Sequence, residues 1–222
     1  MLLAIDTSTT LTGLALYDAT GPRAECVWLA GRNHTAQLLP QLDLLLRHLG
    51  VGRDELHAVA VALGPGSWSG LRVGLSVAKG LALAGGLALL GVSTLDALAY
   101  QHGQPDMATF PLIRLGRERF ATAEFRPTDS DPGRLGPDHN VTLAELGAGL
   151  VGPVRFCGDL DAEVLAHLRD SLGEQAHWPA PAASLRRPSF LAALAWQRFA
   201  AGAYDDLTTL EPIYLGEPVK LK

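Results

Sequence analysis

Cysteine, net positive charge and long apolar runs are scarce in this 222-residue chain, and each scarcity excludes a class of protein. The two cysteines, Cys26 and Cys157, are too few for a disulfide scaffold, so we expect both to be reduced. The formal net charge is −5, whereas an autonomous nucleic-acid-binding domain usually carries a basic excess. We therefore expect the chain alone to bind nucleic acid only weakly.

The longest stretch without charge, residues 80–95, contains four glycines. A membrane-spanning helix needs about 20 predominantly apolar residues, which this stretch does not supply. The N-terminal segment, residues 1–6, has no basic residue and reaches an acid at Asp6, which is unlike a secretory signal peptide. The sequence thus predicts a cytoplasmic protein with no membrane partner.

In the first hundred residues, short apolar runs alternate with longer apolar-periodic segments, which is typical of an α/β fold. Residues 2–5 and 14–17 flank a polar stretch and predict a hairpin. Pro40 leaves two alternatives for the first helix: it begins near Leu39, or it begins near Thr35 and bends. Further strands are predicted at 26–29, 58–63 and 87–92, and further helices at 69–84 and 94–101.

The second half repeats this order weakly, with a hairpin, a later strand and then a helix. Because chain-breaking residues occur at 104–106, we predict two lobes, residues 1–104 and 105–222. The last helix and the tail could pack back onto the first lobe. The predicted elements of this half are strands at 111–115, 120–125 and 154–157, a linker at 179–188, and a final helix at 190–201 that Ser189 caps.

A polar turn, Asp6-Thr7-Ser8-Thr9-Thr10, follows the first predicted strand. Hydroxyls and backbone N–H groups in such a turn can hold phosphate oxygens, and an aspartate can hold Mg²⁺ through water. The alternative is an ordinary β-turn in which Asp and Thr side chains bond to their own backbone. Local sequence leaves both interpretations open.

A glycine-rich segment, residues 64–70, precedes the predicted helix at 69–84. It lacks the Gly-Lys-Ser/Thr ending of a phosphate loop, so a tight turn between strand and helix is the better interpretation. Gly66, Gly70 and Gly74 recur every four residues, and the helix is apolar nearly all round, as expected for a helix buried on most sides. The residues that bury this helix could belong to another subunit or to the chain itself.

Neither a metal site nor a catalytic nucleophile has a local motif. The seven histidines form no His-x3-His or His-Glu-x2-His pair, and neither cysteine has a nearby thiol. A Gly-x-Ser-x-Gly nucleophile elbow is missing too, since Ser67 and Ser69 flank the centre of residues 66–70. We therefore predict no catalytic residue and no metal ligand.

Several segments together resemble the bacterial TsaB family. They are residues 3–8, 64–74 and 78–82, with further similarity at residues 34–40 and in the Pro-x-Tyr-Leu of residues 212–215. The sequence departs from the family pattern in two places. Residues 113–117 stand where the family often has an Asp-Ala-Arg-like turn, and Gly216 follows Leu215 where the family often has arginine.

The resemblance implies an α/β, two-lobed actin/hexokinase-like (ribonuclease-H-like) fold, in which each lobe is a mixed sheet with helices. It also implies a non-catalytic scaffold for TsaD, the similar subunit that forms N6-threonylcarbamoyladenosine beside the tRNA anticodon. TsaE would be a further component, tRNA would be bound only indirectly, and ATP with Mg²⁺ would bind only in the complex. Asp6, Thr7, Ser8 and Thr9 would then be a degenerate nucleotide site.

The first helix and the helix at 69–84 carry more apolar surface than one sheet face needs, which predicts an interface. We expect them to pack against the same pair in a second copy, giving a homodimer, and against the equivalent pair of TsaD. In this interpretation Gly70 and Gly74 let the facing helix approach closely. The expected interface residues are Leu38, Leu42, Leu45, Leu46, Gly70, Val73, Gly74, Val77 and Leu81.

Two alternative functions remain. One is a free-standing ATP-dependent enzyme, a phosphotransferase or ATPase that uses Asp6 and the hydroxyls after it. The other is a metallopeptidase-like activity, against which the missing histidine pair counts.

Overall fold

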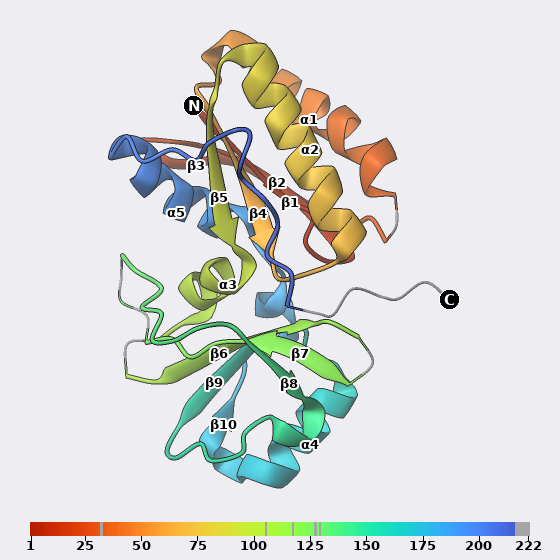
Figure 1. The fold of residues 1–222 in the computed structure, drawn as a ribbon, viewed down its shortest axis with the longest axis vertical. Coiled ribbons are helices and arrows are strands. Elements are labelled where there is room, and N and C mark those ends of the chain that lie inside the picture. The colour runs from red at the N-terminus through yellow and green to blue at the C-terminus, as the bar shows by residue number, and fades with distance from the viewer. Residues whose placement is uncertain (32, 105, 117, 127, 129, 216–222) are drawn as a thin grey trace. The chain divides into compact units, whose positions relative to one another are not determined.

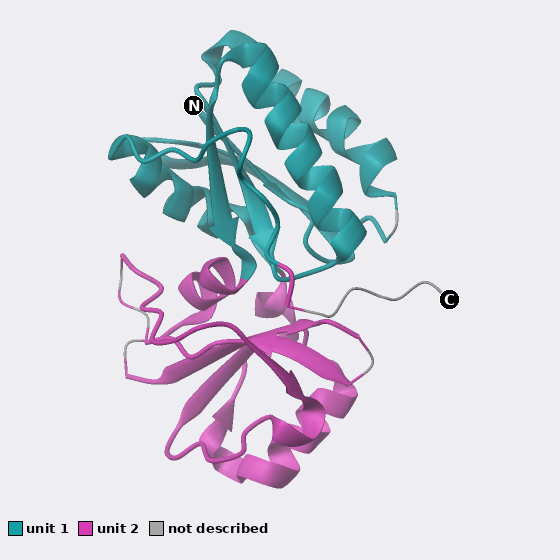
Figure 2. Ribbon diagram, viewed as in Figure 1, with its two compact units in different colours: residues 1–94, 186–213 teal, residues 95–185, 214–222 magenta. Residues whose placement is uncertain are grey.

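A computed structural model describes residues 1–31, 33–104, 106–116, 118–126, 128 and 130–215. These residues form two compact units, which Figure 2 distinguishes by colour. Unit 1 comprises residues 1–94 and 186–213, and unit 2 comprises residues 95–185 together with the tail from Tyr214. The sequence placed the boundary after residue 104, whereas the units change at residue 94. The last helix belongs to unit 1, in keeping with the expectation that it could pack back onto the first lobe, whereas the tail from Tyr214 belongs to unit 2.

Unit 1 is built on a five-stranded mixed sheet of order β3-β2-β1-β4-β5 (Figure 1). The central strand β1 pairs antiparallel with β2 and parallel with β4, and its Ile5 lies opposite Leu14 and Val61. This confirms the predicted opening hairpin. The strands are β1 (Leu2–Asp6), β2 (Leu11–Asp18), β3 (Gly21–Leu29), β4 (Ala58–Gly64) and β5 (Ala88–Ser93).

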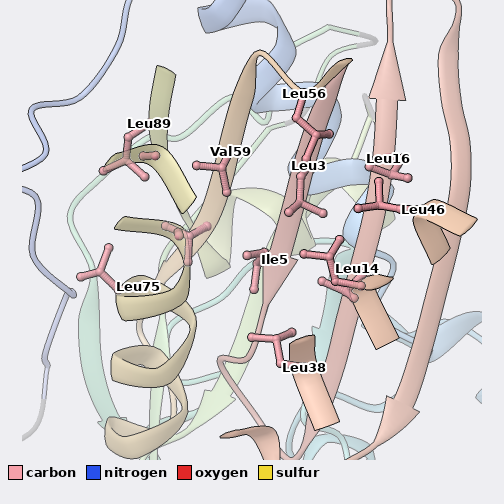
Figure 3. Close-up of a cluster of buried hydrophobic side chains, with 14 residues drawn as sticks. Leu3, Ile5, Leu14, Leu16, Leu38, Leu46, Leu56, Val59, Leu75 and Leu89 are labelled. Atoms are coloured by element: carbon pink, nitrogen blue, oxygen red, sulfur yellow. The ribbon is translucent and has the colours of Figure 1, made fainter. Parts of the chain in front are cut away.

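Helices α1 (His34–Leu49) and α2 (Trp68–Gly85) cover one face of this sheet, and α5 (Pro188–Ala200) packs against the other (Figure 1). Leu38 from α1 and Leu75 from α2 meet strand side chains such as Ile5 in one buried apolar cluster (Figure 3). Successive side chains of β1 point to opposite faces of the sheet, and both faces are buried. Leu3 and Ile5 belong to this cluster, whereas Leu2 and Ala4 are buried outside it.

The ends of helices α1 and α5 test two predictions made from the sequence. Helix α1 begins at His34 and runs through Pro40, so the earlier of the two predicted starts is correct, and Gly50 ends the helix in the left-handed conformation at φ 64°. The predicted cap of the last helix is wrong, because α5 begins one residue before Ser189, with Pro188 at its first position and Arg187 as N-cap. Glu25 on β3 accepts hydrogen bonds from the Ser189 N–H and hydroxyl, each at 3.1 Å, and so caps α5 from the sheet.

Unit 2 contains a second five-stranded mixed sheet, with order β10-β9-β6-β7-β8. Helix α3 (Thr94–His102) contributes Leu95 and Leu98 to one apolar cluster, and α4 (Ala162–Leu172) contributes Val164 and Leu168 to another. The strands are β6 (Ala108–Arg114), β7 (Arg119–Thr122), β8 (His139–Thr142), β9 (Val154–Gly158) and β10 (Ala176–His177).

The two sheets share one connectivity. In each, the first strand is central, the second and third follow antiparallel on one side, and the fourth and fifth lie parallel on the other. A helix follows the fourth strand in both units, as α2 follows β4 and α4 follows β9. The weak repeat expected from sequence and the α/β class are therefore confirmed.

No helix in the described part of the chain is both long enough and apolar enough to cross a membrane.

Residues 205–210 form a turn that seats Leu207 and Leu210 on the unit 1 core, and Asp206 organises it. Its Oδ1 accepts the Thr208 hydroxyl, the backbone N–H groups of Thr208 and Thr209 at 2.9 Å each, and the Thr209 hydroxyl at 3.2 Å. These hydrogen bonds lower the pKa of Asp206 from 3.8 to about 2, and the bond from the Thr208 hydroxyl has the largest effect.

We expect the carboxyl carbon of Asp206 to titrate near pH 2 in an NMR experiment, because the hydrogen bonds favour the charged form. The stability that this carboxylate contributes is complete above its ordinary pKa of 3.8 and is lost as the pH falls through about 2. Thr208→Val should move the midpoint back toward 3.8. A wild-type midpoint near 3.8 would contradict the turn geometry.

Candidate functional site

The polar turn after β1 is the sequence's main candidate site, and the structure shows it folded onto itself. Asp6 is 5% exposed, and its Oδ1 accepts the Ser8 N–H at 2.9 Å and the Ser8 hydroxyl at 2.5 Å. The Thr9 hydroxyl accepts the Leu11 N–H at 3.3 Å. The side chains thus bond to the local backbone, as the β-turn alternative requires.

Arg186, at the start of the segment that returns to unit 1, reaches the same turn. Its Nη1 donates to the Ser8 hydroxyl oxygen at 2.6 Å and lies 3.6 Å from Asp6 Oδ2. The side chains of Arg186 and Asp6 are only 9% and 7% exposed, so this is a buried ion pair. One carboxylate oxygen of Asp6 therefore faces serine and the other faces a guanidinium.

Three glycines, two in α2 and one just before it, pack against this turn of their own chain. A Cβ on Gly66 would lie 2.2 Å from the Ser8 carbonyl oxygen, one on Gly70 would lie 2.1 Å from that of Thr7, and one on Gly74 would lie 2.3 Å from the Thr7 hydroxyl. The Thr7 hydroxyl also donates to the Gly70 carbonyl at 2.7 Å. The expectation that Gly70 and Gly74 open the helix to a partner is thus corrected, because the chain's own turn covers them.

A buried histidine lies beside the turn. His34, the first residue of α1, has its Nδ1 2.6 Å from the Thr12 hydroxyl and is 5% exposed. Burial lowers the pKa of His34, while the nearby Asp6 opposes that shift. The ring is therefore neutral at physiological pH and acts as a hydrogen-bonding partner of Thr12.

The turn does not fit a magnesium ion. Mg²⁺ requires near-octahedral oxygen ligands and keeps several waters, whereas Ser8 and Arg186 occupy the two oxygens of Asp6. Within the described residues, no group of three or more His, Cys, Asp or Glu side chains could hold a metal ion. The arrangement holds the Asp6 carboxylate and the Arg186 guanidinium together as a buried ion pair.

Sequence reasoning missed Arg186, Thr12 and His34 as parts of this cluster. Arg186 is 178 positions from Ser8, so no local spacing could connect them. One signal was available: Arg186 and Arg187 are adjacent cations within the otherwise uncharged segment 179–188.

The expected interface residues divide into two groups. Leu38, Leu42, Leu46, Gly70 and Gly74 are buried in unit 1, whereas Leu45, Val73, Val77 and Leu81 are partly buried and pack against its core. The exposed large apolar side chains of the two helices are others, namely Leu39, Leu44, Leu49, Trp68 and Leu83, of which Leu83 is 74% exposed. On the outward surface of α1 and α2 these apolar side chains lie among exposed polar residues such as Gln41, Arg72 and Ser76.

Unit 2 offers Gly158-Asp159 as its counterpart to a phosphate loop, and this is also engaged internally. Asp159 accepts the Arg114 N–H at 2.9 Å, and the Arg114 guanidinium pairs with Asp161, the N-cap of α4. Gly158 has φ +99°, and a Cβ there would lie 2.3 Å from the Leu112 carbonyl oxygen. Of the positions that depart from the family pattern, Arg117 and Gly216 lie outside the described residues.

Comparison with known proteins identifies relatives over nearly the whole chain. A protein from Bacillus subtilis named tRNA threonylcarbamoyladenosine biosynthesis protein TsaB is 31% identical over 217 residues, which cover 96% of this chain and 93% of that one. The family model described as TsaD, tRNA N6-adenosine threonylcarbamoyltransferase, matches residues 28–123. A tRNA N6-adenosine threonylcarbamoyltransferase from Nitratidesulfovibrio vulgaris is 46% identical over 87 residues, covering 39% of this chain and 24% of that one.

Among solved structures, YeaZ from Pseudomonas aeruginosa superposes with a TM-score of 0.80 at 23% identity, over 96% of this chain and 99% of that one. The similarity establishes the fold, which is the two-lobed actin/hexokinase-like, ribonuclease-H-like arrangement of two mixed sheets. The Bacillus subtilis relative matches nearly the whole of this chain and establishes its family. This chain belongs to the TsaB family.

Proposed function

We propose that this protein is a non-catalytic partner of TsaD in the cytoplasmic formation of N6-threonylcarbamoyladenosine in tRNA. The observation that carries the proposal is the match, over 96% of the chain, to a protein named for threonylcarbamoyladenosine biosynthesis. The closed turn after β1 supports the non-catalytic part, because Arg186 stands where a phosphate-binding site would need free space.

The proposed docking surface is the outward side of α1 and α2. Both helices lie within residues 28–123, the part that matches the TsaD family, so the partner should present a similar helix pair. A surface that pairs with a similar surface can also pair with a second copy of itself, which would give a competing homodimer. In this proposal TsaE joins the assembly and ATP with Mg²⁺ binds only there. Because the net charge is −5, the basic surface for tRNA comes from TsaD.

Gly80 provides a probe of this surface. It is exposed on α2, and a Cβ there would meet nothing within 4 Å, so a larger side chain leaves the fold intact. We expect Gly80→Arg to weaken binding to purified TsaD by roughly tenfold or more in calorimetry, because an unpaired charge would be desolvated on docking. Ala200→Arg places the same charge at the exposed end of α5, on the opposite face of the sheet, and should bind as the wild type does.

Two results would contradict the proposal. Absence of any binding between the wild-type chain and TsaD would contradict the partnership. Equal binding by Gly80→Arg and Ala200→Arg would show that the docking surface lies elsewhere.

A free-standing ATP-dependent enzyme is the disfavoured alternative. Robust ATP turnover by the isolated chain, abolished by an Asp6→Ala variant that circular dichroism shows to be folded, would establish it instead.

A further inference from the structure

The buried pair of Arg186 and Asp6 lies at the carboxyl end of β1, where neighbouring parallel strands of a sheet commonly form ligand sites. A buried carboxylate is stable only when a cation or hydrogen-bond donors compensate it. Here Ser8 supplies two donors to Asp6 Oδ1, and Arg186 supplies the positive charge beside Oδ2. The turn thus contains all the elements of a cation site, with the cation provided by the chain.

We propose that the Arg186 guanidinium is the resident cation of this turn, taking the place of a divalent ion, and that its removal creates a site for a free guanidinium ion. Arg186 is 8% exposed, so truncating its side chain leaves a buried space and an uncompensated carboxylate. A planar cation that can donate hydrogen bonds to both Ser8 and Asp6 fits that vacancy best, because it restores the charge and the bond that were lost.

Neighbouring contacts keep the vacancy in place when the side chain is lost. Pro188 packs under Gly13, where a Cβ would lie 2.9 Å from its Cγ, and Arg187 pairs with Glu25 at 2.8 Å. These contacts hold the backbone at position 186 against β2 and β3. Arg187 also provides a matched control, since its side chain is 51% exposed whereas that of Arg186 is buried.

The test is chemical rescue of Arg186→Ala, followed by thermal unfolding of the full chain. Guanidinium chloride at low millimolar concentration should raise the Tm of this variant, by roughly 3–6 °C once it reaches about ten times its dissociation constant. The same additions should not raise the Tm of the wild type or of Arg187→Ala. Urea, which has a similar planar shape but no charge, and potassium chloride should not rescue Arg186→Ala.

Three outcomes would overturn the proposal: no rise with guanidinium beyond that with potassium chloride, an equal rise with urea, or Mg²⁺ stabilising the wild type in a way that Asp6→Asn abolishes. A double variant, Asp6→Asn with Arg186→Ala, removes the uncompensated charge. It should fold even if Arg186→Ala does not, and its Tm should not respond to guanidinium. If the double variant fails to fold while Asp6→Asn alone folds, Arg186 acts through packing and the proposal is wrong.

Discussion

Asp6→Ala is expected to lower the free energy of unfolding by about 3–5 kcal/mol, the usual cost of breaking a buried ion pair by removing one partner. The substitution leaves the Arg186 guanidinium buried without its carboxylate and removes the acceptor of the Ser8 N–H and hydroxyl. Urea unfolding of the purified chain, followed by circular dichroism, measures the change.

Asp18→Ala is the matched control, because it removes nearly the same motif from the surface of the same sheet. Asp18 accepts the N–H and hydroxyl of Thr20 at 2.8 and 2.7 Å and pairs with Arg23 at 3.2 Å, as Asp6 does with Ser8 and Arg186. The Arg23 and Asp18 side chains are 50% and 26% exposed, so water compensates the charge that remains. A loss for Asp6→Ala no larger than that for Asp18→Ala would show that burial of the pair is not what matters.

Two identical substitutions in α2 should have opposite effects. Gly80→Ala is expected to stabilise the protein by about 0.5–1 kcal/mol, because glycine inside a helix is unfavourable and the new methyl group meets open space. Gly70→Ala should destabilise it by about 1–3 kcal/mol despite the same gain in helix propensity, because its Cβ would lie 2.1 Å from the Thr7 carbonyl oxygen. Urea midpoints of the two variants, compared with the wild type, give both signs.

Equal stabilisation by both substitutions would show that the turn after β1 does not pack closely against Gly70 of α2. Gly74→Leu cannot serve as a probe of the partner interface for the same reason, since its side chain would meet the Thr7 hydroxyl. Among the glycines of this helix, Gly80 is the one at which an added Cβ would meet open space.

Local patterns in the sequence predicted the elements well, because each depends on neighbouring residues. The opening hairpin and α2 both follow from spacing within a few residues. The four-residue glycine period was also correct as a sign of close approach. Spacing within one helix cannot say what approaches it, and here a turn some 60 residues earlier does so.

The parts that sequence reasoning missed depend on contacts between distant segments. Arg186 meets Ser8, and Glu25 caps α5 in place of Ser189, across separations of 178 and 164 positions. Both contacts arise because the chain leaves unit 1 after Thr94 and returns at Arg186. A boundary placed by a single run of breaker residues at 104–106 could not represent a unit made of two separate stretches.

This discontinuity sets an order of assembly during synthesis. Residues 95–185 leave the ribosome before α5 does, so unit 2 can begin to form while one face of the first sheet is still bare. The Asp6 carboxylate likewise has no cation beside it until Arg186 has been synthesised. Strand β1 is therefore synthesised well before it becomes fully buried, and a chaperone that recognises exposed apolar strands would bind there.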